Sequence, residues 1–275
     1  MELRGKTAVL TGANSGIGPG LAQTLAREEM NLVPVGHHRE GLVDTALAIA
    51  GLGGRSITVR ADVSKFRDRE RMADEATGAI GTVSRLCNNA FVGPFASSAE
   101  TTMAEWDWVL SGNLWGVIHG MHVFLALFEA QGEGHIYTTA SESGLYRLPF
   151  LAAYNTSKSA VVGLMQSLAC DLRASRSPVT ASVPCPGAVR THILDSARER
   201  PETATRSAAL PPPTDAFGEM VCDAGSDGMD PEAVGACVLE GIRKGQFWIF
   251  SHEHVPQSAF HQAKAMLEEN RLIDL

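Results

Sequence analysis

The sequence has no excess of basic residues and few cysteines. Its 23 Lys and Arg residues are outnumbered by 31 Asp and Glu residues, which gives a formal net charge of −8. A nucleic-acid groove or a face for an anionic membrane needs concentrated positive charge, so neither is predicted as the main partner. The five cysteines are scattered and odd in number, so neither a disulfide framework nor a CxxC metal-binding pair is predicted. Such cysteine usage is typical of a reducing intracellular compartment.

Long apolar stretches are also missing. No run reaches 18 consecutive apolar residues, so the sequence does not predict a membrane span. The first strand-like segment begins near residue 6, and no pattern of a secretory leader precedes it. We therefore expect a soluble, cytoplasmic protein. Hydrophobic residues make up 44% of the chain, which excludes a disordered protein and is enough for a full core.

Short apolar segments alternate with longer helical patterns along the chain. This alternation is typical of right-handed crossovers between parallel strands, with helices on both faces of one sheet. We predict a single α/β domain over residues 1–275, with three layers and a doubly wound parallel sheet. The predicted strands cover 6–11, 31–36, 55–61, 83–88, 134–140, 178–185 and 246–251. The predicted helices lie near 17–29, 39–52, 67–79, 102–130, 152–175 and 231–244.

Residues 196–230 break this alternation. Prolines occupy 211–213, and residues 207–230 contain acidic side chains but no Lys or Arg. A long irregular segment in a compact domain is usually functional or disordered. One interpretation is a lid over a substrate pocket that uses Phe217, Met220 and Met229, and the other is a solvated surface excursion. Further along, residues 255–275 carry apolar residues at helical spacing, so we expect a C-terminal helix there.

A glycine-rich turn follows the first predicted strand. Residues 11–18 have the spacing Gly-x-x-x-Gly-x-Gly directly before a helix. Glycines let the backbone approach a pyrophosphate closely, and the N–H groups at a helix start bind phosphate. We predict a dinucleotide-binding turn, with a glycine-rich turn that binds no ligand as the alternative. Its candidate cofactor residues are Gly12, Asn14, Ser15, Gly16, Ile17 and Gly18.

The end of the second predicted strand bears on the choice of dinucleotide. An acid near this point binds the ribose 2′-hydroxyl of NAD, whereas a cation accommodates the 2′-phosphate of NADP. Gly36 stands where the acid is expected, and the cofactor candidates His37, His38 and Arg39 follow it. We predict NADP(H) as the preferred cofactor, with NAD(H) as the alternative. The basic residues could also form only a surface turn, since histidine is a weak cation near neutral pH.

Asp62 and Val63 follow the third predicted strand. The Asp62 carboxylate could accept a hydrogen bond from an adenine amine. It could equally stand at the N-terminal end of the next helix, and the sequence does not separate the two interpretations.

Tyr154 and Lys158 are four residues apart at the start of a predicted helix, so they share one face. A phenol is a weak acid–base group at neutral pH, and a neighbouring ammonium stabilises its phenolate. Such a tyrosine can exchange a proton with a carbonyl or alcohol oxygen. Ser141, at the end of a predicted strand, could hydrogen-bond the same oxygen. A Tyr/Lys pair alone is usually a surface feature, and its combination with the glycine-rich turn is what favours catalysis.

In these features the sequence resembles the short-chain dehydrogenase/reductase family, in its shorter single-domain branch. The resemblance covers residues 5–195 and returns at 231–251. It rests on motifs in the family's order and spacing: the 11–18 turn, Asp62, residues 88–90, Asn113, Ser141, Tyr154, Lys158 and residues 186–191. The resemblance implies a Rossmann-type fold of seven strands in the order 3-2-1-4-5-6-7. It also implies hydride transfer between nicotinamide C4 and a carbonyl or alcohol carbon.

The resemblance further implies the role of each catalytic residue. Tyr154 would be the general acid or base, and Lys158 would lower its pKa and bind the nicotinamide ribose. Ser141 would orient the substrate oxygen, and Asn113 would hold a water that joins Lys158 to a proton relay. The remaining implied cofactor residues are Asn88, Asn89, Ala90, Pro186, Gly187, Val189 and Thr191.

One residue departs from the family pattern. Phe91 replaces the glycine that usually ends Asn-Asn-Ala-Gly, so a ring there could crowd the cofactor or wall the pocket. By position in the family, the substrate candidates are Ser141, Ser143, Leu145, Tyr146, Tyr154 and His192, with Phe91, Phe95, Leu148, Ala188 and Ile193 lining the same pocket. Such a pocket suits an apolar or aromatic ketone or secondary alcohol.

We therefore predict an oxidoreductase that transfers a hydride between NADP(H) and a small hydrophobic ketone or secondary alcohol. The alternatives are an NAD-dependent alcohol dehydrogenase of the same fold and a non-catalytic sensor of dinucleotides. The resemblance implies a homodimer or homotetramer built on the helices near 102–130 and 152–175. The pairs His119/His122 and His252/His254 lack a third ligand at metal-binding spacing, so no metal site is predicted.

Overall fold

The computed structural model describes residues 2–191, 193, 196, 199–204 and 212–272. Seven parallel strands form one sheet in the order β3-β2-β1-β4-β5-β6-β7, which confirms the predicted topology. The strands are β1 (Thr7–Thr11), β2 (Asn31–Gly36), β3 (Val59–Arg60), β4 (Arg85–Asn88), β5 (Gly134–Thr138), β6 (Val179–Pro184) and β7 (Trp248–Ile249). The main helices of the layers are α1 (Ile17–Arg27), α2 (Arg39–Gly51), α3 (Phe66–Ile80), α4 (Met103–Leu110), α5 (Gly116–Gln131), α6 (Ala152–Ala174) and α8 (Pro231–Arg243).

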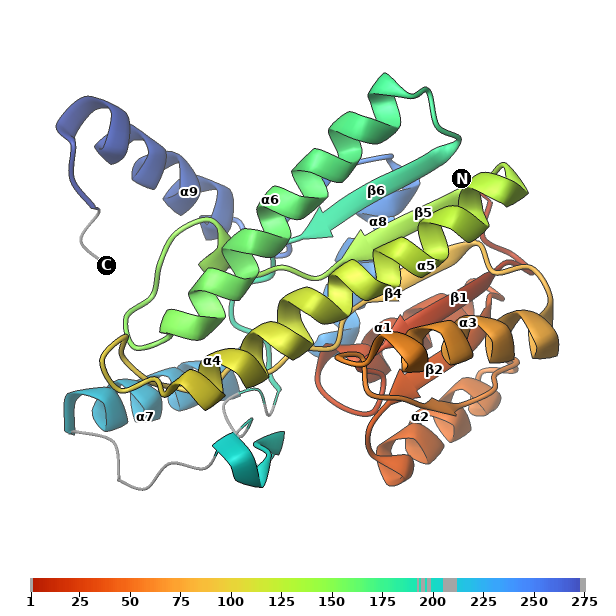
Figure 1. Ribbon diagram of the computed structural model, residues 1–275, viewed down its shortest axis with the longest axis horizontal. Coiled ribbons are helices and arrows are strands. Elements are labelled where there is room, and N and C mark those ends of the chain that lie inside the picture. Colours follow the sequence, from red (N-terminus) through yellow and green to blue (C-terminus); the bar gives the residue numbers. More distant parts are fainter. Residues whose placement is uncertain (1, 192, 194–195, 197–198, 205–211, 273–275) are drawn as a thin grey trace.

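The sheet lies between two helical layers, and each layer has its own apolar core (Figure 1). One core joins the sheet to α3, α5 and α6 through Met72, Phe124 and Met165. The other joins it to α1, α2 and α8 through residues such as Leu21 and Val238. The strands are buried on both faces, as expected for a parallel sheet covered on both sides.

The helix expected near 102–130 is continuous but not uniform. Between α4 and α5 it contains one π-helical turn, Ser111–Trp115, which holds Asn113. The whole stretch Met103–Gln131 is long and apolar enough to cross a membrane by composition alone. A single such helix is weak evidence for a membrane span, because the central helix of a covered sheet passes the same test. Here its inner side packs Phe124 and Phe128 into the core beneath the sheet.

The segment after β6 contains a helix that the sequence pattern did not predict. Within 196–230 the described part forms α7 (Pro212–Ser226), preceded by a short 3₁₀ turn at Glu202–Ala204. Phe217 of α7 contacts the rings of Phe95 and Phe150. The prolines at the start of α7 are compatible with a helix, because the first turn needs no backbone donor.

The predicted C-terminal helix is present as α9 (His254–Lys264), followed by a π-helical turn at Ala265–Glu269. Val255 at its start is buried in the core, and the rest of α9 extends away from the sheet (Figure 1). Two of the predicted strands are shorter than expected. The predicted strand 55–61 contributes only Val59–Arg60 as a ladder, with an isolated bridge between Leu32 and Ser56, and 246–251 contributes only Trp248–Ile249.

Candidate active site

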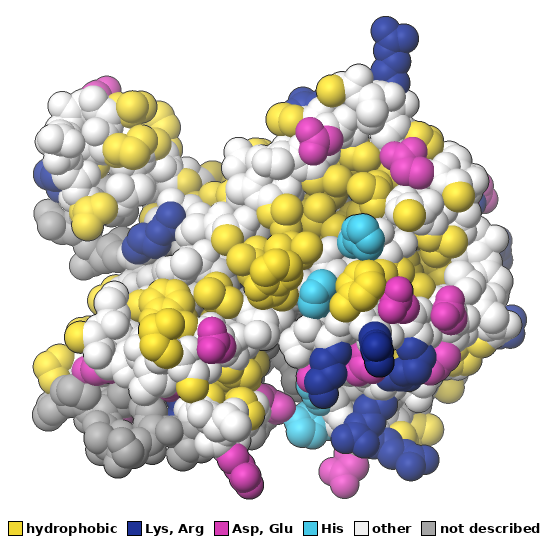
Figure 2. Space-filling view, viewed as in Figure 1, with side chains coloured by type: hydrophobic (Ala, Val, Ile, Leu, Met, Phe, Trp, Pro, Cys, Tyr) yellow, Lys and Arg dark blue, Asp and Glu magenta, His cyan; other side chains and the backbone are white. Residues whose placement is uncertain are grey.

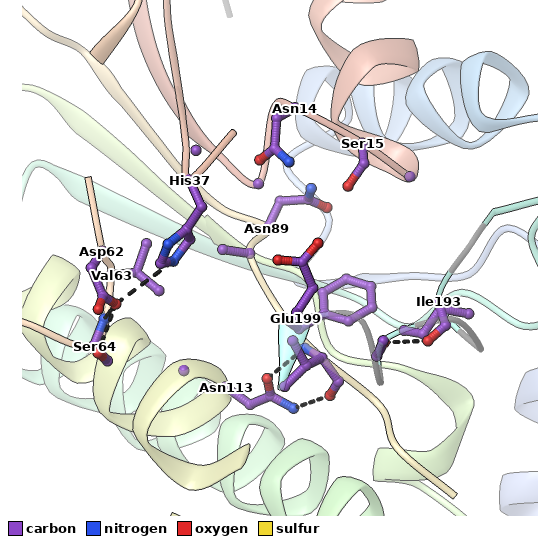
Figure 3. Close-up of a pocket in the computed structure, with 18 of the residues that line it drawn as sticks. Asn14, Ser15, His37, Asp62, Val63, Ser64, Asn89, Asn113, Ile193 and Glu199 are labelled. Atoms are coloured by element: carbon purple, nitrogen blue, oxygen red, sulfur yellow. Dashed lines mark hydrogen bonds and ion pairs between the residues drawn. The ribbon is translucent and has the colours of Figure 1, made fainter. Parts of the chain in front are cut away.

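A cavity of about 440 Å³ opens at the carboxyl ends of the central strands (Figure 3). Its walls come from the turn after β1, the ends of β2 and β3, the loop after β4, the π-turn and the segment 191–201. In an open parallel sheet, ligands bind where the strand order reverses, and here that point lies between β1 and β4. The described lining residues are Gly12, Asn14, Ser15, Gly16, Ile17, Gly36, His37, Asp62, Val63, Ser64, Asn89, Ala90, Phe91, Val92, Trp108, Ser111, Gly112, Asn113, Thr191, Ile193, Ser196, Glu199 and Pro201.

The glycine-rich turn forms one end of this cavity. Gly12 has a positive φ of 66°, and a side chain there would meet the Ala90 backbone at 2.8 Å. Helix α1 begins after Gly16, which has no side chain to cap the first N–H groups. These N–H groups and the positive end of the helix dipole therefore remain for a phosphate. The turn and the cavity beside it fit a dinucleotide.

The two histidines after β2 each face a carboxylate. His37 lies 3.7 Å from Asp62, and His38 lies 2.7 Å from Glu199, which belongs to the segment after β6. Figure 3 shows His37 and Asp62 on one side of the cavity and Glu199 facing it from another. Both carboxylates line the cavity, so the region near the histidines is not a simple cationic site.

Asp62 combines the two properties that its sequence position suggested. Its carboxylate accepts hydrogen bonds from the Ser64 backbone N–H at 3.0 Å and the Ser64 hydroxyl at 2.6 Å, just before α3. It also lines the cavity. Burial acts to raise the pKa of Asp62, but the bonds from Ser64 and the nearby His37 and Lys65 leave it below its usual value. The group is therefore a carboxylate at neutral pH, able to accept a hydrogen bond from a ligand.

Ser141, Tyr154 and Lys158 are all buried in the fold. Tyr154 interacts with the Ser141 side chain through a hydrogen bond, and the Lys158 ammonium lies 5.6 Å from the Tyr154 ring centre. Lys158 Nζ donates to the Thr139 carbonyl at 2.8 Å. Burial raises the pKa of Tyr154, with the Ser141 hydrogen bond opposing that effect and the Glu142 charge adding to it. Burial lowers the pKa of Lys158 to about 7.

The side chain of Asn113 connects the loop after β4, which lines the cavity, to helix α6. Its amide accepts from Val92 N–H at 2.8 Å and donates to the Val92 carbonyl at 2.8 Å and to Ser157 Oγ at 3.0 Å. Ser157 in turn donates to the Tyr154 carbonyl at 2.7 Å. A π-turn shifts the helical hydrogen bonds by one residue, and such turns recur at functional sites. Asn113 therefore holds the loop after β4 against the first turn of α6.

Phe91 lies between the cavity and the Tyr154/Lys158 pair. Its ring lines the cavity, the Lys158 ammonium sits 3.9 Å from its centre, and the Tyr154 ring is 6.3 Å away. Ser141, Tyr154 and Lys158 are not among the described lining residues. The residue that departs from the family pattern thus covers the ammonium with an aromatic face, a favourable contact in a buried site.

The structure distributes the other predicted site residues over three places. Eleven of the cofactor candidates line the cavity: Gly12, Asn14, Ser15, Gly16, Ile17, His37, Asp62, Val63, Asn89, Ala90 and Thr191. The candidates Gly18, His38, Arg39, Asn88, Pro186, Gly187 and Val189 are not among the described lining residues, although His38 pairs with Glu199, which lines the cavity. Among the substrate candidates, Ser143 and Tyr146 are buried and Leu145 packs against the core, while His192 lies outside the described residues.

Sequence reasoning missed several residues of this region. Glu199 reaches His38 from 161 positions away, and the Ser196 hydroxyl accepts a hydrogen bond from Gly93 N–H at 3.1 Å. Trp108 and Ser111 join the wall because the π-turn displaces the helix there. For Ser196 and Glu199 the sequence signal was limited to the lack of strands in 196–230. That lack indicated an irregular segment but not the residues that it contacts.

The fold and the site define a dinucleotide-dependent oxidoreductase, and comparisons with known proteins agree. A family model described as short chain dehydrogenase matches residues 6–202, so the chain belongs to this family of NAD(P)-dependent oxidoreductases. Among curated proteins, a putative oxidoreductase, SadH, of Mycobacterium tuberculosis is 31% identical over 196 residues, 71% of each chain. A D-beta-hydroxybutyrate dehydrogenase of Cupriavidus necator is 32% identical over 192 residues, 70% of this chain and 74% of that protein.

A solved structure is more similar over the whole length. It is a short chain dehydrogenase/reductase from Burkholderia phymatum in complex with NAD, with 34% identity and a TM-score of 0.96. The match covers 100% of this chain and 99% of the other.

Proposed function

We propose that this enzyme interconverts a small apolar secondary alcohol and its ketone, with Tyr154 as the proton-transferring group. The observation that carries the proposal is the buried Ser141–Tyr154–Lys158 set beside Phe91, which lines a cavity that begins at the glycine-rich turn. When bound, the dinucleotide supplies or accepts the hydride. The residues of this chain supply orientation and the proton.

The proton chemistry follows from burial. A raised Tyr154 pKa keeps the phenol protonated at neutral pH, which is the form that gives a proton to a carbonyl oxygen. The Ser141 hydroxyl, already bonded to Tyr154, would hydrogen-bond that same oxygen. Lys158, whose pKa of about 7 lies near neutrality, would stabilise the phenolate that forms. In the opposite direction the same phenolate would accept a proton from an alcohol.

The surroundings of Tyr154 support an apolar substrate. A side chain on Gly93 would meet the Tyr154 ring at 3.1 Å and Ile193 at 3.3 Å, so Gly93 packs against both. Phe95 packs edge-to-face against Phe217 of α7. Segment 196–230 would serve as the lid over this region, with α7 as its core. Because residues 207–230 contain acidic side chains and no basic ones, such a lid disfavours anionic substrates.

For the cofactor, the contacts favour NAD(H). The 2′-phosphate of NADP needs cations, yet His37 and His38 already face Asp62 and Glu199. The usual ribose-binding acid would stand at position 36, where Gly36 is found. The Asn14 side chain occupies that space, because a Cβ on Gly36 would lie 2.1 Å from Asn14 Oδ1. Glu199 is then the carboxylate that would accept hydrogen bonds from the ribose diol. The NADP(H) preference predicted from the sequence is the opposing alternative, and kinetics with the two cofactors distinguish them.

For assembly, we propose a homodimer or homotetramer that uses the face of α4, α5 and α6. Trp115 is 53% exposed at the start of α5, and Met103 is exposed at the start of α4. Figure 2 shows hydrophobic side chains gathered on this face of the molecule. The helix Met103–Gln131 is apolar but only one third of its most apolar window is buried, which suits a helix that packs against a second copy. The cytoplasmic location stays a prediction.

The experiment is a panel of ketones and secondary alcohols, assayed with NADH, NADPH and their oxidised forms at the nicotinamide absorbance. We expect turnover of apolar members, and Tyr154→Phe should lower kcat at least a hundredfold with cofactor binding retained. Absence of turnover with every pair, or a Tyr154→Phe variant at the wild-type rate, would refute the proposal.

A further inference from the structure

A cluster of three ionisable side chains surrounds Gly187, on the side of the 186–191 segment away from the cavity. Glu142 follows Ser141 in the chain, His252 lies between β7 and α9, and His254 is the first residue of α9. A side chain on Gly187 would meet Glu142 Oε2, His252 Cγ and His254 Cε1, each at 3.1 Å. Two segments distant in sequence thus pack closely against one glycine, and a side chain there would crowd all three residues.

Both ring nitrogens of His252 form hydrogen bonds with the backbone of this segment. Gly187 N–H can only donate, so His252 Nδ1 is the acceptor at 3.2 Å. The Ala188 carbonyl can only accept, so His252 Nε2 is the donor at 3.0 Å. The ring is therefore neutral with its proton on Nε2, and the Ser251 hydroxyl adds a contact of 2.8 Å to Nδ1. One imidazole therefore hydrogen-bonds the backbone of two consecutive residues, Gly187 and Ala188.

Glu142 connects the same segment to the catalytic serine. Its backbone N–H donates to the Pro186 carbonyl at 2.9 Å. Its carboxylate Oε2 accepts from the Tyr146 hydroxyl at 2.5 Å and pairs with His254 Nε2 at 2.9 Å. Burial and the Glu142 carboxylate raise the pKa of Tyr146, so this phenol remains a donor. Tyr146, a substrate candidate by sequence, instead supports Glu142.

We propose that Glu142, His252 and His254 form a clamp that positions residues 186–188 against Ser141 and Tyr154, and so sets how well the cofactor binds and reacts. The proposal rests on the proposed function and on the family resemblance, which implies that residues of 186–191 bind the cofactor. The three are positioning residues, because they act through the backbone of 186–188 and through Ser141. The C-terminal part of the chain thereby controls the geometry of a site built from the central strands.

The clamp has a defined response to acid. Protonated His252 would carry a hydrogen on Nδ1 that faces the Gly187 N–H, so the hydrogen bond from Gly187 would be lost. The titratable groups packed around it are Glu142 and Tyr146 from the segment after Ser141 and His254 from α9, and Glu253 beside them is exposed. Protonation of His254 leaves its bond to Glu142 in place, since Nε2 donates in either state. Acid therefore weakens the clamp through His252.

Two variants of His252 separate positioning from folding. His252→Leu removes the hydrogen bonds to both Gly187 and Ala188. His252→Asn keeps an acceptor near the position of Nδ1 but does not titrate. We expect His252→Leu to weaken NADH binding about tenfold, the effect of two hydrogen bonds, with His252→Asn in between. Amide exchange at 187–188, followed by mass spectrometry without cofactor, should be faster in His252→Leu. His261→Phe, on the exposed part of α9, is the matched control and should behave as wild type.

The pH dependence of the NADH dissociation constant distinguishes a positioning role of His252 from a purely structural one. The wild-type NADH dissociation constant should rise on acidification, and that of His252→Asn should stay flat in the same range. Glu142→Gln, which keeps an acceptor for Tyr146, should retain more kcat than Glu142→Ala. Equal dissociation constants, exchange rates and pH profiles in wild type and His252→Leu would overturn the clamp. A wild type that binds NADH but turns over no alcohol or ketone would refute the proposed function instead, and the binding and exchange data would still judge the clamp.

Discussion

Lys158 is buried with a charge that the folded chain tolerates poorly, and removing that charge should stabilise the protein. The fall in its pKa from 10.5 to about 7 corresponds to roughly 5 kcal/mol, because each pH unit is worth about 1.36 kcal/mol. Lys158→Met keeps a long side chain but leaves the buried Thr139 carbonyl without its donor, which costs about 2 kcal/mol. The net gain without cofactor is then about 3 kcal/mol at acidic pH.

The sign of the effect depends on pH in a defined way. Below about pH 7 the amine is charged in both the folded and the unfolded protein, so the folded protein carries the full cost of the buried charge. Between about 7 and 10.5 the folded amine is neutral while the unfolded one remains protonated, so this cost shrinks as pH rises. Lys158→Met should therefore be more stable than wild type at pH 6 and less stable near pH 10, with no catalytic activity at either.

The measurement is urea unfolding of cofactor-free wild type and variant across this pH range, followed by circular dichroism. Lys244→Met is the control, because Lys244 is 59% exposed and its replacement should give a small difference that hardly changes with pH. A Lys158→Met variant that is less stable than wild type at pH 6, or two stability curves that run parallel, would refute the reasoning.

Three further variants test the site and the assembly. Glu199→Gln should lower kcat/KM for NADH several-fold and narrow the preference for NADH over NADPH, since it removes a carboxylate beside His38; a wild type that prefers NADPH contradicts the assignment. Phe91→Gly should bind NADH up to about tenfold more tightly in a fluorescence titration, because it removes a ring that lines the cavity and separates it from the Lys158 ammonium; unchanged or weaker binding speaks against it. Trp115→Glu should dissociate the oligomer in light scattering with the fold intact, and an unaltered mass would place the interface elsewhere.

The sheet and the core of the site were predictable because their signals are local. Each strand is a short apolar run, and the 11–18 turn and the Tyr154/Lys158 spacing each lie within eight residues of sequence. The structure confirms the strand order that the family resemblance implies. It also joins Tyr154 to Ser141 by a hydrogen bond, thirteen positions away and on the adjoining loop.

The parts that escaped prediction depend on contacts between distant segments. Helix α7 begins at prolines, which disfavour a helix in most positions, and its burial depends on Phe217 meeting Phe95 and Phe150. The π-turn at Asn113 has no signature in an apolar helical run. The partner of His38 lies 161 residues away, and no periodicity reports such a distance.

The crowding of Gly36 by Asn14 links two positions that a protein engineer would otherwise change one at a time. An aspartate grafted at 36 to strengthen NAD recognition would collide with Asn14 Oδ1 at once. For the graft to fit, the Asn14 side chain has to move aside or be replaced by a smaller one, and Asn14 also lines the cavity. A substitution at 36 made to redesign the cofactor preference therefore also reshapes the cavity wall at residue 14.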